Sequence, residues 1–366
     1  MDFTLDEDLV ALQTLAREIF TDRASTDRVR AVETSETRVD EELWRALATS
    51  GLTGLAVPEA HGGAGLGPAA LAVVLEEQGR TVAPVPLWPT ALAALLLGED
   101  GDRHAALLAE LADGTARVTV ALEEYGAADP LEPQASAAGG AEGWRLSGVK
   151  AAVPTPLGAA HVLVSAATDQ GPRLFLVATD APGVTWHLAP VTTHDFAGEL
   201  VLDGTPGEPV GGADAVADAV RLGRVLIGAV QVGVAEGALA LAASYLAERE
   251  QFGRPLGSFQ AVQHQLADCW IDIDAMRVTL WQAISDAEEA GPAAGASALV
   301  ASWWRAQAGL DVVHRVQHVH GGIGVDVDYP VHRYFLWGKQ LAGTLGGPAA
   351  LLADLGELVA TPGGHA

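Results

Sequence analysis

The strongest constraint on the fold of this chain is a series of long helical segments that begins near Ala213. Helices of this length without internal caps are typical of bundles, in which each helix packs along most of its length. The sequence therefore predicts four or five long C-terminal helices. The apolar pattern that predicts them runs over Ala213–Glu248, Phe259–Ala290, Ser297–Val319 and Val331–Ala342. A di-iron bundle would need Glu-x-x-His pairs on facing helices, and the sequence contains none.

The segment from Leu5 to about Glu110 also predicts helices. Asp40 precedes two glutamates and is expected to cap a helix that Gly51 ends. A glycine-rich loop, Pro58–Gly65, then separates this helix from the next. Two further helices are expected over Pro68–Gln78 and Ala91–Leu97.

The composition changes near Arg117, where short runs rich in branched residues begin. Such runs, bounded by turn residues, are typical of strands. The expected strands are Val118–Leu122, His161–Val164, Arg173–Val177 and Glu199–Leu202, the last ended by Asp203-Gly204. The order is thus α, then β, then α, in an α+β chain of 366 residues. The expected domains are residues 1–117 (helical), 118–208 (a small β domain) and 209–366 (a helical bundle).

The charge and cysteine content exclude several classes of function. The formal net charge is -26, which repels phosphate backbones and argues against nucleic acid as a partner. The single cysteine, Cys269, excludes an internal disulfide and a thiolate metal cluster, and it is expected in the core. The acidic N-terminus has no basic segment of a signal peptide, and polar residues interrupt the apolar run Val225–Leu246. We therefore expect a cytoplasmic protein without a membrane span.

Two segments carry motifs that point to a cofactor. Residues 245–260 contain Arg-Glu-Gln-Phe-Gly-Arg-Pro, and residues 317–330 contain His-Gly-Gly-Ile-Gly followed by Tyr-Pro. Arg249 supplies a planar fork suited to a pyrophosphate, with Gln251 and Phe252 beside it. Gly321 and Gly322 let backbone N–H groups approach a phosphate or ribose without a Cβ in the way.

Both segments closely resemble signatures of the acyl-CoA dehydrogenase family, and the loop Pro58–Gly65 matches a third, weaker element. The resemblance covers nearly the whole chain. It implies N-terminal helices, a middle β-barrel domain and a C-terminal four-helix bundle. It also implies that the two segments hold the adenosine diphosphate half of FAD across a subunit interface. The residues expected to bind the cofactor are Arg249, Gln251, Phe252, Gln260, Gln317, Gly321 and Gly322.

The base that the family's chemistry requires is missing. That chemistry removes a proton from Cα and a hydride from Cβ of an acyl thioester, so a carboxylate must lie beside Cα. The resemblance implies two positions for this glutamate, and here they carry Leu345 and Gly223. Neither side chain can abstract a proton. We therefore expect no catalytic residue in this chain.

The segments that bind the flavin ring in the family also look altered. The stretch Leu122–Asp129 stands where a Thr-Glu-Pro-x-x-Gly-Ser-Asp-like segment is expected, and Lys150–Thr155 stands for a Lys-x-Trp-Ile-Thr-like strand. Ala152 occupies the position of the aromatic residue that shields the ring. Pro154 has no N–H to offer the flavin.

This division of losses indicates a non-catalytic subunit that completes a partner's FAD site. The pattern is similar to the partner-dependent α2β2 acyl-CoA dehydrogenases of bacterial steroid side-chain degradation, and residues 328–337 look like their partner subunits. The resemblance implies four partners or ligands. These are FAD, a catalytic acyl-CoA dehydrogenase paralogue, a bulky acyl-CoA such as a steroid-derived one, and an electron-transfer flavoprotein.

Other interpretations of the same residues stay open. His314, His318, His320 and His332 cluster in sequence, but no carboxylate lies at ligand spacing on the same face, so we expect packing or surface roles and no metal. Asp326 and Asp328 are expected to cap a helix or to bond the turn backbone, although a displaced base among Asp326, Asp328 and His320 is an alternative. The chain could also be a homo-oligomeric dehydrogenase with a relocated base, a flavin monooxygenase of the same fold, or a scaffold without flavin.

Overall fold

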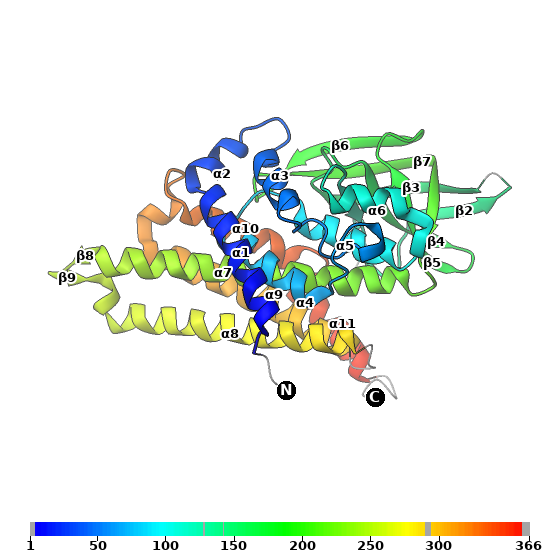
Figure 1. Cartoon of the computed structure of the whole chain (residues 1–366). Helices are drawn as coiled ribbons and strands as arrows, with labels where there is room; N and C mark the ends of the chain where they lie inside the picture. Colours follow the sequence, from blue (N-terminus) through cyan, green and yellow to red (C-terminus); the bar gives the residue numbers. More distant parts are fainter. Residues whose placement is uncertain (1–3, 127–128, 142, 290–293, 361–366) are drawn as a thin grey trace. The chain divides into compact units, whose positions relative to one another are not determined.

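The computed structural model describes residues 4–126, 129–141, 143–289 and 294–360 (Figure 1). The chain forms two compact units, which are described separately. The sheet unit comprises residues 29–71 and 84–224, and the helical unit comprises residues 1–28, 72–83 and 225–366. Each unit therefore combines segments that lie far apart in the sequence.

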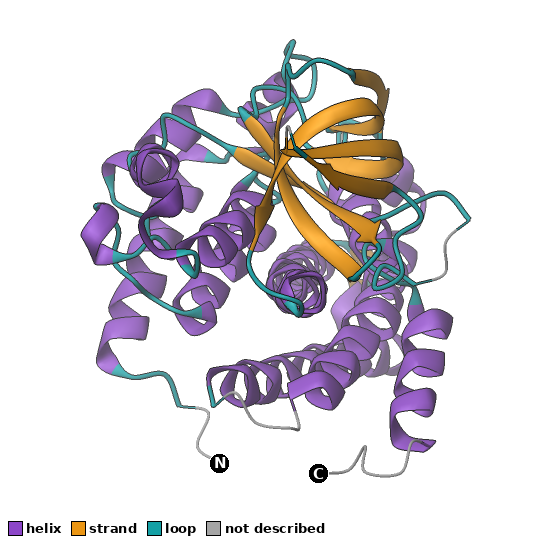
Figure 2. Ribbon diagram, turned by 90° about the vertical axis from the view of Figure 1, so that its right-hand side faces the viewer, coloured by secondary structure: helices purple, strands orange, loops and turns teal. Residues whose placement is uncertain are grey.

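The sheet unit is built on seven strands that curl into a barrel. The strands β4, β2, β3, β7 and β5 follow one another as hydrogen-bonded neighbours, and β5 pairs again with β4 (Figure 2). This pairing closes the ring and leaves β1 beside β4 and β6 beside β7. The strands are β1 (Val118–Ala121), β2 (Ser136–Gly140), β3 (Gly143–Pro154), β4 (His161–Thr168), β5 (Gly171–Ala178), β6 (Val184–Pro190) and β7 (Phe196–Val210).

The predicted strands are confirmed within β1, β4, β5 and β7, but three strands escaped prediction. β2 reads Ser-Ala-Ala-Gly-Gly, which has low intrinsic β-propensity, and the tertiary pairing with β3 makes it a strand. The expected end of the last strand at Asp203-Gly204 is wrong. β7 continues to Val210, because the register against β3 shifts at this pair of residues and forms a bulge, with Gly204 at φ +61°.

Helices complete the sheet unit. The predicted cap at Asp40 is confirmed, since its carboxylate accepts hydrogen bonds from the backbone N–H groups of Glu42 and Leu43 at the start of α3. Gly51 follows the end of this helix at φ +76°. The helices here are α3 (Glu41–Thr49), α5 (Leu87–Gly98) and α6 (Ala105–Ala112), with the 3-10 turns η1 (Glu59–His61) and η2 (Gly101–His104), while α2 (Thr26–Val32) begins in the helical unit.

One lysine is fully buried inside the barrel. Lys150 of β3 has no exposed surface, and its Nζ lies 2.6 Å from Oε1 of Glu124 and 2.9 Å from Oγ of Ser165. Burial alone would raise the pKa of Glu124, but hydrogen bonds from Lys150 and from the N–H groups of Ala135 and Gln134 outweigh it and lower that pKa. The pair is therefore ionised, and it fixes the segment before β2 to β3.

The four long helices that the sequence predicts are confirmed in the helical unit, with ends that differ by a few residues. The helix α11 and the short hairpin β8–β9 were not predicted. The elements are α1 (Glu7–Arg23), most of α4 (Pro68–Thr81), α7 (Ala215–Glu248) from Val225 on, β8 (Glu250–Gln251), β9 (Arg254–Pro255), the 3-10 turn η3 (Leu256–Ser258), α8 (Gln260–Glu288), α9 (Ala294–His320), the 3-10 turn η4 (Gly321–Val325), α10 (Val331–Gly343) and α11 (Pro348–Ala360). Cys269 is buried in α8, as expected.

Helix α7 is long and apolar enough to cross a bilayer by length and composition. However, 78% of its most apolar window is buried within the protein. Glycine allows α4 to approach it very closely, since a Cβ on Gly233 would lie 1.9 Å from the carbonyl oxygen of Glu76. The apolar character of α7 therefore serves packing.

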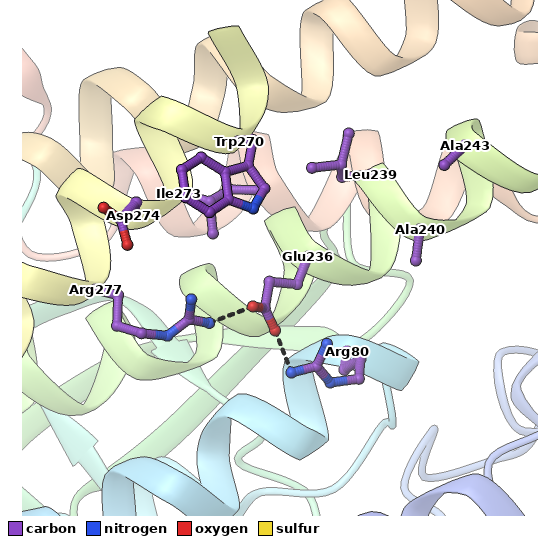
Figure 3. Close-up of a pocket in the computed structure, with 9 residues that line it drawn as sticks. All are labelled: Arg80, Glu236, Leu239, Ala240, Ala243, Trp270, Ile273, Asp274 and Arg277. Atoms are coloured by element: carbon purple, nitrogen blue, oxygen red, sulfur yellow. Dashed lines mark hydrogen bonds and ion pairs between the residues drawn. The ribbon is translucent and has the colours of Figure 1, made fainter. Parts of the chain in front are cut away.

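A network of charged side chains ties four helices of this unit together. Glu77 of α4 accepts a hydrogen bond of 2.8 Å from Arg17 of α1 and one of 3.1 Å from Arg80. Arg277 of α8 lies 3.3 Å from the buried carboxylate of Glu76. Glu236 of α7 pairs with both Arg80 and Arg277 (Figure 3). Each buried carboxylate in the network thus has an arginine partner, as burial of a charge requires.

A groove of about 240 Å³ lies above this network, between α7 and α8 (Figure 3). Leu239, Ala240, Ala243, Trp270 and Ile273 supply its apolar wall. Both arginines at its base are already paired with carboxylates, so the groove offers no uncompensated positive charge to a phosphate. None of the predicted cofactor residues lines it.

The pH dependence of stability should reveal Glu76. Burial raises the pKa of Glu76 to about 7, although Arg277 opposes the rise. Because this value lies above the 4.5 of the unfolded chain, the folded protein holds the extra proton between these two values. Stability from this group is therefore present at low pH and is lost as the pH rises toward 7. The free energy of unfolding of wild type minus Glu76→Gln should fall by roughly 2–3 kcal/mol between about pH 5 and pH 8.

Urea titrations of both proteins at the two pH values provide the measurement. Glu18→Gln, on the exposed surface of α1, controls for the loss of one formal charge. Parallel pH profiles for wild type and Glu76→Gln would contradict the assignment.

Removal of Lys150 should destabilise the barrel strongly. Lys150→Met leaves the carboxylate of Glu124 buried without its cation, which costs about 3 kcal/mol or more. Arg103 and Glu208 form the matched control, since the same 2.6 Å separates them but both are nearly half exposed. Arg103→Met should cost less than about 1 kcal/mol in the same urea titration. Equal losses for the two variants would show that burial does not decide the cost.

Candidate functional site

The first predicted cofactor segment lies where α7 ends and the hairpin begins. The N–H of Arg249 donates to the carbonyl of Tyr245 at 2.9 Å, and its own carbonyl accepts from the N–H of Leu256 at 2.8 Å. These bonds fix the backbone of Arg249 at the base of the hairpin β8–β9. Within the described residues its guanidinium has no protein partner, so it is available to a ligand.

The hairpin tip presents an aromatic ring to solvent. Phe252 has φ +52°, followed by Gly253 at φ +77°, and its side chain is 91% exposed. The ring of Phe252 meets the ring of Phe259 edge-on, with 6.1 Å between centroids. The guanidinium of Arg254 stacks on the Phe259 ring, 4.0 Å from its centroid. The hairpin tip therefore carries an exposed aromatic ring on a backbone conformation that L-residues rarely adopt.

Two predicted glutamines near the hairpin have simpler surroundings. The side-chain amide of Gln251 donates to the carbonyl of Glu250 at 2.8 Å. Gln260 is exposed at the first turn of α8. Both side chains are exposed, and nothing in the contacts of the described residues prevents them from turning to a ligand.

The second predicted segment forms a tight turn at the end of α9. Gly321 has φ +61°, and a Cβ at Gly321 or Gly322 would meet no atom within 4 Å, so the backbone of this turn is open on that side. The amide of Gln317 donates to the carbonyl of Gly324 and fastens the turn to the helix. The Oε1 of Gln317 is buried and has no donor among the described residues.

A cluster of three rings brings the two segments together. The ring of Tyr245, one turn before Arg249 on α7, stacks on His320 with 4.9 Å between centroids and 19° between planes. Tyr329 contacts both, at 6.0 Å from Tyr245 and 5.4 Å from His320. Since His320 directly precedes Gly321, the stack joins the base of the hairpin to the glycine turn. Sequence reasoning missed these tyrosines; their aromatic character next to each motif was the available signal.

His320 is buried and holds one orientation. Its Nδ1 lies 2.7 Å from the carbonyl oxygen of Val316, and its Nε2 is buried without a partner among the described residues. Burial lowers the pKa of His320, so the ring is neutral, with the proton on Nδ1 and a lone pair on Nε2. A buried ring inside an aromatic stack is a poor candidate for a displaced base. Asp326 accepts a hydrogen bond from the N–H of Asp328 at 2.9 Å, so its predicted bond to the turn backbone is confirmed.

The two positions at which the resemblance implies a base lie in different units, and neither carries a carboxylate. Leu345 is 2% exposed at φ +54°, just after α10, and Gly223 lies inside α7. The buried guanidinium of Arg305 donates to the carbonyls of Leu341 and Gly346 and so holds the segment around Leu345. A buried apolar side chain thus occupies the first of these two positions.

The barrel segments that looked altered keep one polar feature. Lys150 and Glu124 form the buried ion pair described above. The sequence did not lead us to expect this pair, although a lysine within an apolar strand was an available signal. Ala152 has φ +51° at a register shift between β3 and β7, and the carbonyl of Pro154 accepts a hydrogen bond from Thr119. Ala127 and Ala128 of the same stretch lie outside the described residues.

The corner formed by the hairpin base and the glycine turn fits a nucleotide. Within the part of the chain that the structure describes, it offers an arginine without a protein partner, an open backbone turn and one buried acceptor, Oε1 of Gln317, that lacks a donor. A dinucleotide has groups that match these. Its phosphate oxygens can accept hydrogen bonds from the arginine and from backbone N–H groups, and its hydroxyl and amino groups can donate to a buried acceptor. Among the described residues, no group of three or more His, Cys, Asp or Glu side chains could hold a metal ion.

Comparison with known proteins identifies the family. Residues 6–115 match the acyl-CoA dehydrogenase N-terminal domain, and residues 211–354 match the acyl-CoA dehydrogenase C-terminal domain. The acyl-CoA dehydrogenase FadE27 of Mycobacterium tuberculosis is 38% identical over 99% of this chain and 100% of its own length.

Two solved structures are similar over nearly the whole chain. A structure of the Tcur3481-Tcur3483 steroid ACAD is 59% identical, with a TM-score of 0.95 over 98% of this chain and 99% of that one. The ChsE4-ChsE5 complex from Mycobacterium tuberculosis is 37% identical, with a TM-score of 0.91 over 99% of this chain and 100% of that one. With its N-terminal helices, its barrel-like sheet and its C-terminal helical segments, this chain belongs to the acyl-CoA dehydrogenase family, an oxidoreductase family of FAD-dependent flavoproteins.

Proposed function

We propose that this chain is the non-catalytic subunit of an α2β2 acyl-CoA dehydrogenase and completes the FAD site of a catalytic paralogue. The observation that carries the proposal is the contrast between two parts of the chain. The corner around Arg249 and Gly321 keeps the groups that a nucleotide needs, whereas the two base positions carry Leu345 and Gly223.

Each residue of the corner has a defined task in this assignment. Arg249 binds the pyrophosphate as a charge-assisted hydrogen-bond donor, and the open turn at Gly321 and Gly322 offers backbone N–H groups to the same nucleotide. The remaining residues that we assign to the nucleotide site are Gln251, Phe252, Gln260 and Gln317. These residues would hold FAD, which would supply a hydride acceptor for the Cβ hydrogen of the acyl thioester. The partner subunit supplies the glutamate that removes the proton from Cα.

The exposed hairpin supports a cofactor site that crosses between subunits. Phe252 stands 91% exposed next to Arg249, which suits insertion into a second chain. Two of the similar solved structures also carry names that pair two components, Tcur3481 with Tcur3483 and ChsE4 with ChsE5.

The product that the family chemistry implies is an α,β-unsaturated acyl-CoA. The steroid name of a similar structure favours a bulky, steroid-like acyl group as the substrate. Electrons then pass to an electron-transfer flavoprotein. We place the assembly in the cytoplasm. Nucleic acid is not a partner in this proposal, because the net charge of -26 on this chain would repel it. The domains that we propose for this chain are residues 1–117, 118–208 and 209–366.

Co-expression with a catalytic paralogue tests the division of labour. Because this chain lacks the base, flavin and dehydrogenase activity should appear together in the complex and not in this chain purified alone. Absorbance of the flavin and reduction of an artificial acceptor by acyl-CoA provide the measurements. Activity of this chain alone would favour a homo-oligomeric dehydrogenase with a relocated base. Substrate oxygenation would favour a monooxygenase, and a complex without flavin would favour a scaffold.

Arg249→Ala in the same complex tests the nucleotide corner. Loss of a charge-assisted hydrogen-bond donor should weaken FAD binding about 10- to 100-fold. Arg23→Ala, at the exposed end of α1, removes an arginine of the same unit and should leave the flavin content unchanged. Flavin retention in Arg249→Ala at the wild-type level would assign this arginine a purely structural role.

A further inference from the structure

The stacked rings of Tyr245 and His320 are the contact through which the two halves of the nucleotide corner meet in the helical unit. Tyr245 lies four residues before Arg249, and the N–H of Arg249 is bonded to its carbonyl at 2.9 Å. His320 lies one residue before Gly321 on α9. The position of the guanidinium relative to the open turn therefore depends on how these two rings pack.

The histidine ring has little freedom to adopt another position. It is 4% exposed, its Nδ1–H donates to the carbonyl of Val316, and Tyr329 closes a further side at 5.4 Å. A near-parallel ring pair at 4.9 Å is a favourable offset arrangement. The histidine side of the contact is thus buried and held by a hydrogen bond, as suits a group that sets the geometry of a binding site.

We propose that His320 and Tyr245 are positioning residues for the nucleotide half of FAD. Their stack sets the separation between Arg249 and the turn at Gly321 and Gly322, and hence the affinity for the cofactor, without either ring acting on the acyl group. The inference rests on the proposed function, because it assumes that this corner holds FAD.

The experiment uses the complex with the catalytic paralogue, stripped of flavin and titrated with FAD. The dissociation constant for FAD is read from flavin fluorescence, and the midpoint of thermal unfolding is recorded for each apo complex. His320→Ala removes the stack and should weaken FAD binding about tenfold. His320→Phe keeps an aromatic ring on Tyr245 and should restore most of that affinity. Activity of His320→Ala should recover at saturating FAD.

Two controls on α9 separate positioning from general packing. Val312→Ala opens a cavity at a fully buried residue of the same helix, so it should lower thermal stability and leave the FAD dissociation constant unchanged. His314→Ala removes a ring contact with Phe335 of 4.8 Å, two turns before the glycine turn, and should also leave FAD binding unchanged.

Tyr245→Leu keeps the inference testable if His320→Ala does not fold. It retains apolar bulk but no stack, and it should weaken FAD binding by a similar factor. Wild-type affinity in both His320→Ala and Tyr245→Leu would overturn the inference, as would an equal loss of affinity in Val312→Ala. Failure of the proposed function looks different, because then the wild-type complex itself would bind no flavin.

Discussion

The burial of one long apolar helix is the constraint on which much of this molecule depends. α7 runs for 34 residues, and most of its apolar window is covered by other parts of the protein. Within the helical unit, Glu236 anchors the charge network in the middle of α7, and Arg249 follows its end. A helix held along its length places these groups at fixed separations, since an α-helix rises 1.5 Å per residue.

The buried charges around α7 show how the helical unit keeps a defined packing. Glu76 is almost fully buried, and the close approach of α4 to α7 at Gly233 leaves no space for water around its backbone carbonyl. Arg277 lies within reach of both Glu76 and Glu236, so one cation from α8 serves two carboxylates from different helices. Such a network specifies which helices meet, in addition to any net stabilisation.

The corner around Arg249 and Gly321 and the segment around Leu345 differ in the groups that they offer. The nucleotide corner is assembled from two segments whose backbones are fixed by hydrogen bonds and whose contact is a ring stack. The position after α10 is instead filled by the buried side chain of Leu345, in a segment held by Arg305. In the function that we propose, a packing role for Leu345 replaces the base at this position, which suits a subunit that supports a reaction in its partner.

Sequence by itself determined the class of fold, the order of its segments and the residues around the cofactor motifs. Periodicity predicts the long helices because burial of one face repeats every three or four residues, and the resemblance to the family motifs predicts that Leu345 and Gly223 stand where a base is expected. Only the tertiary structure decided that Ser136–Gly140 is a strand, that Asp203-Gly204 is a bulge, and that Tyr245 stacks on His320. These features depend on contacts between residues distant in sequence, and no local propensity encodes such contacts.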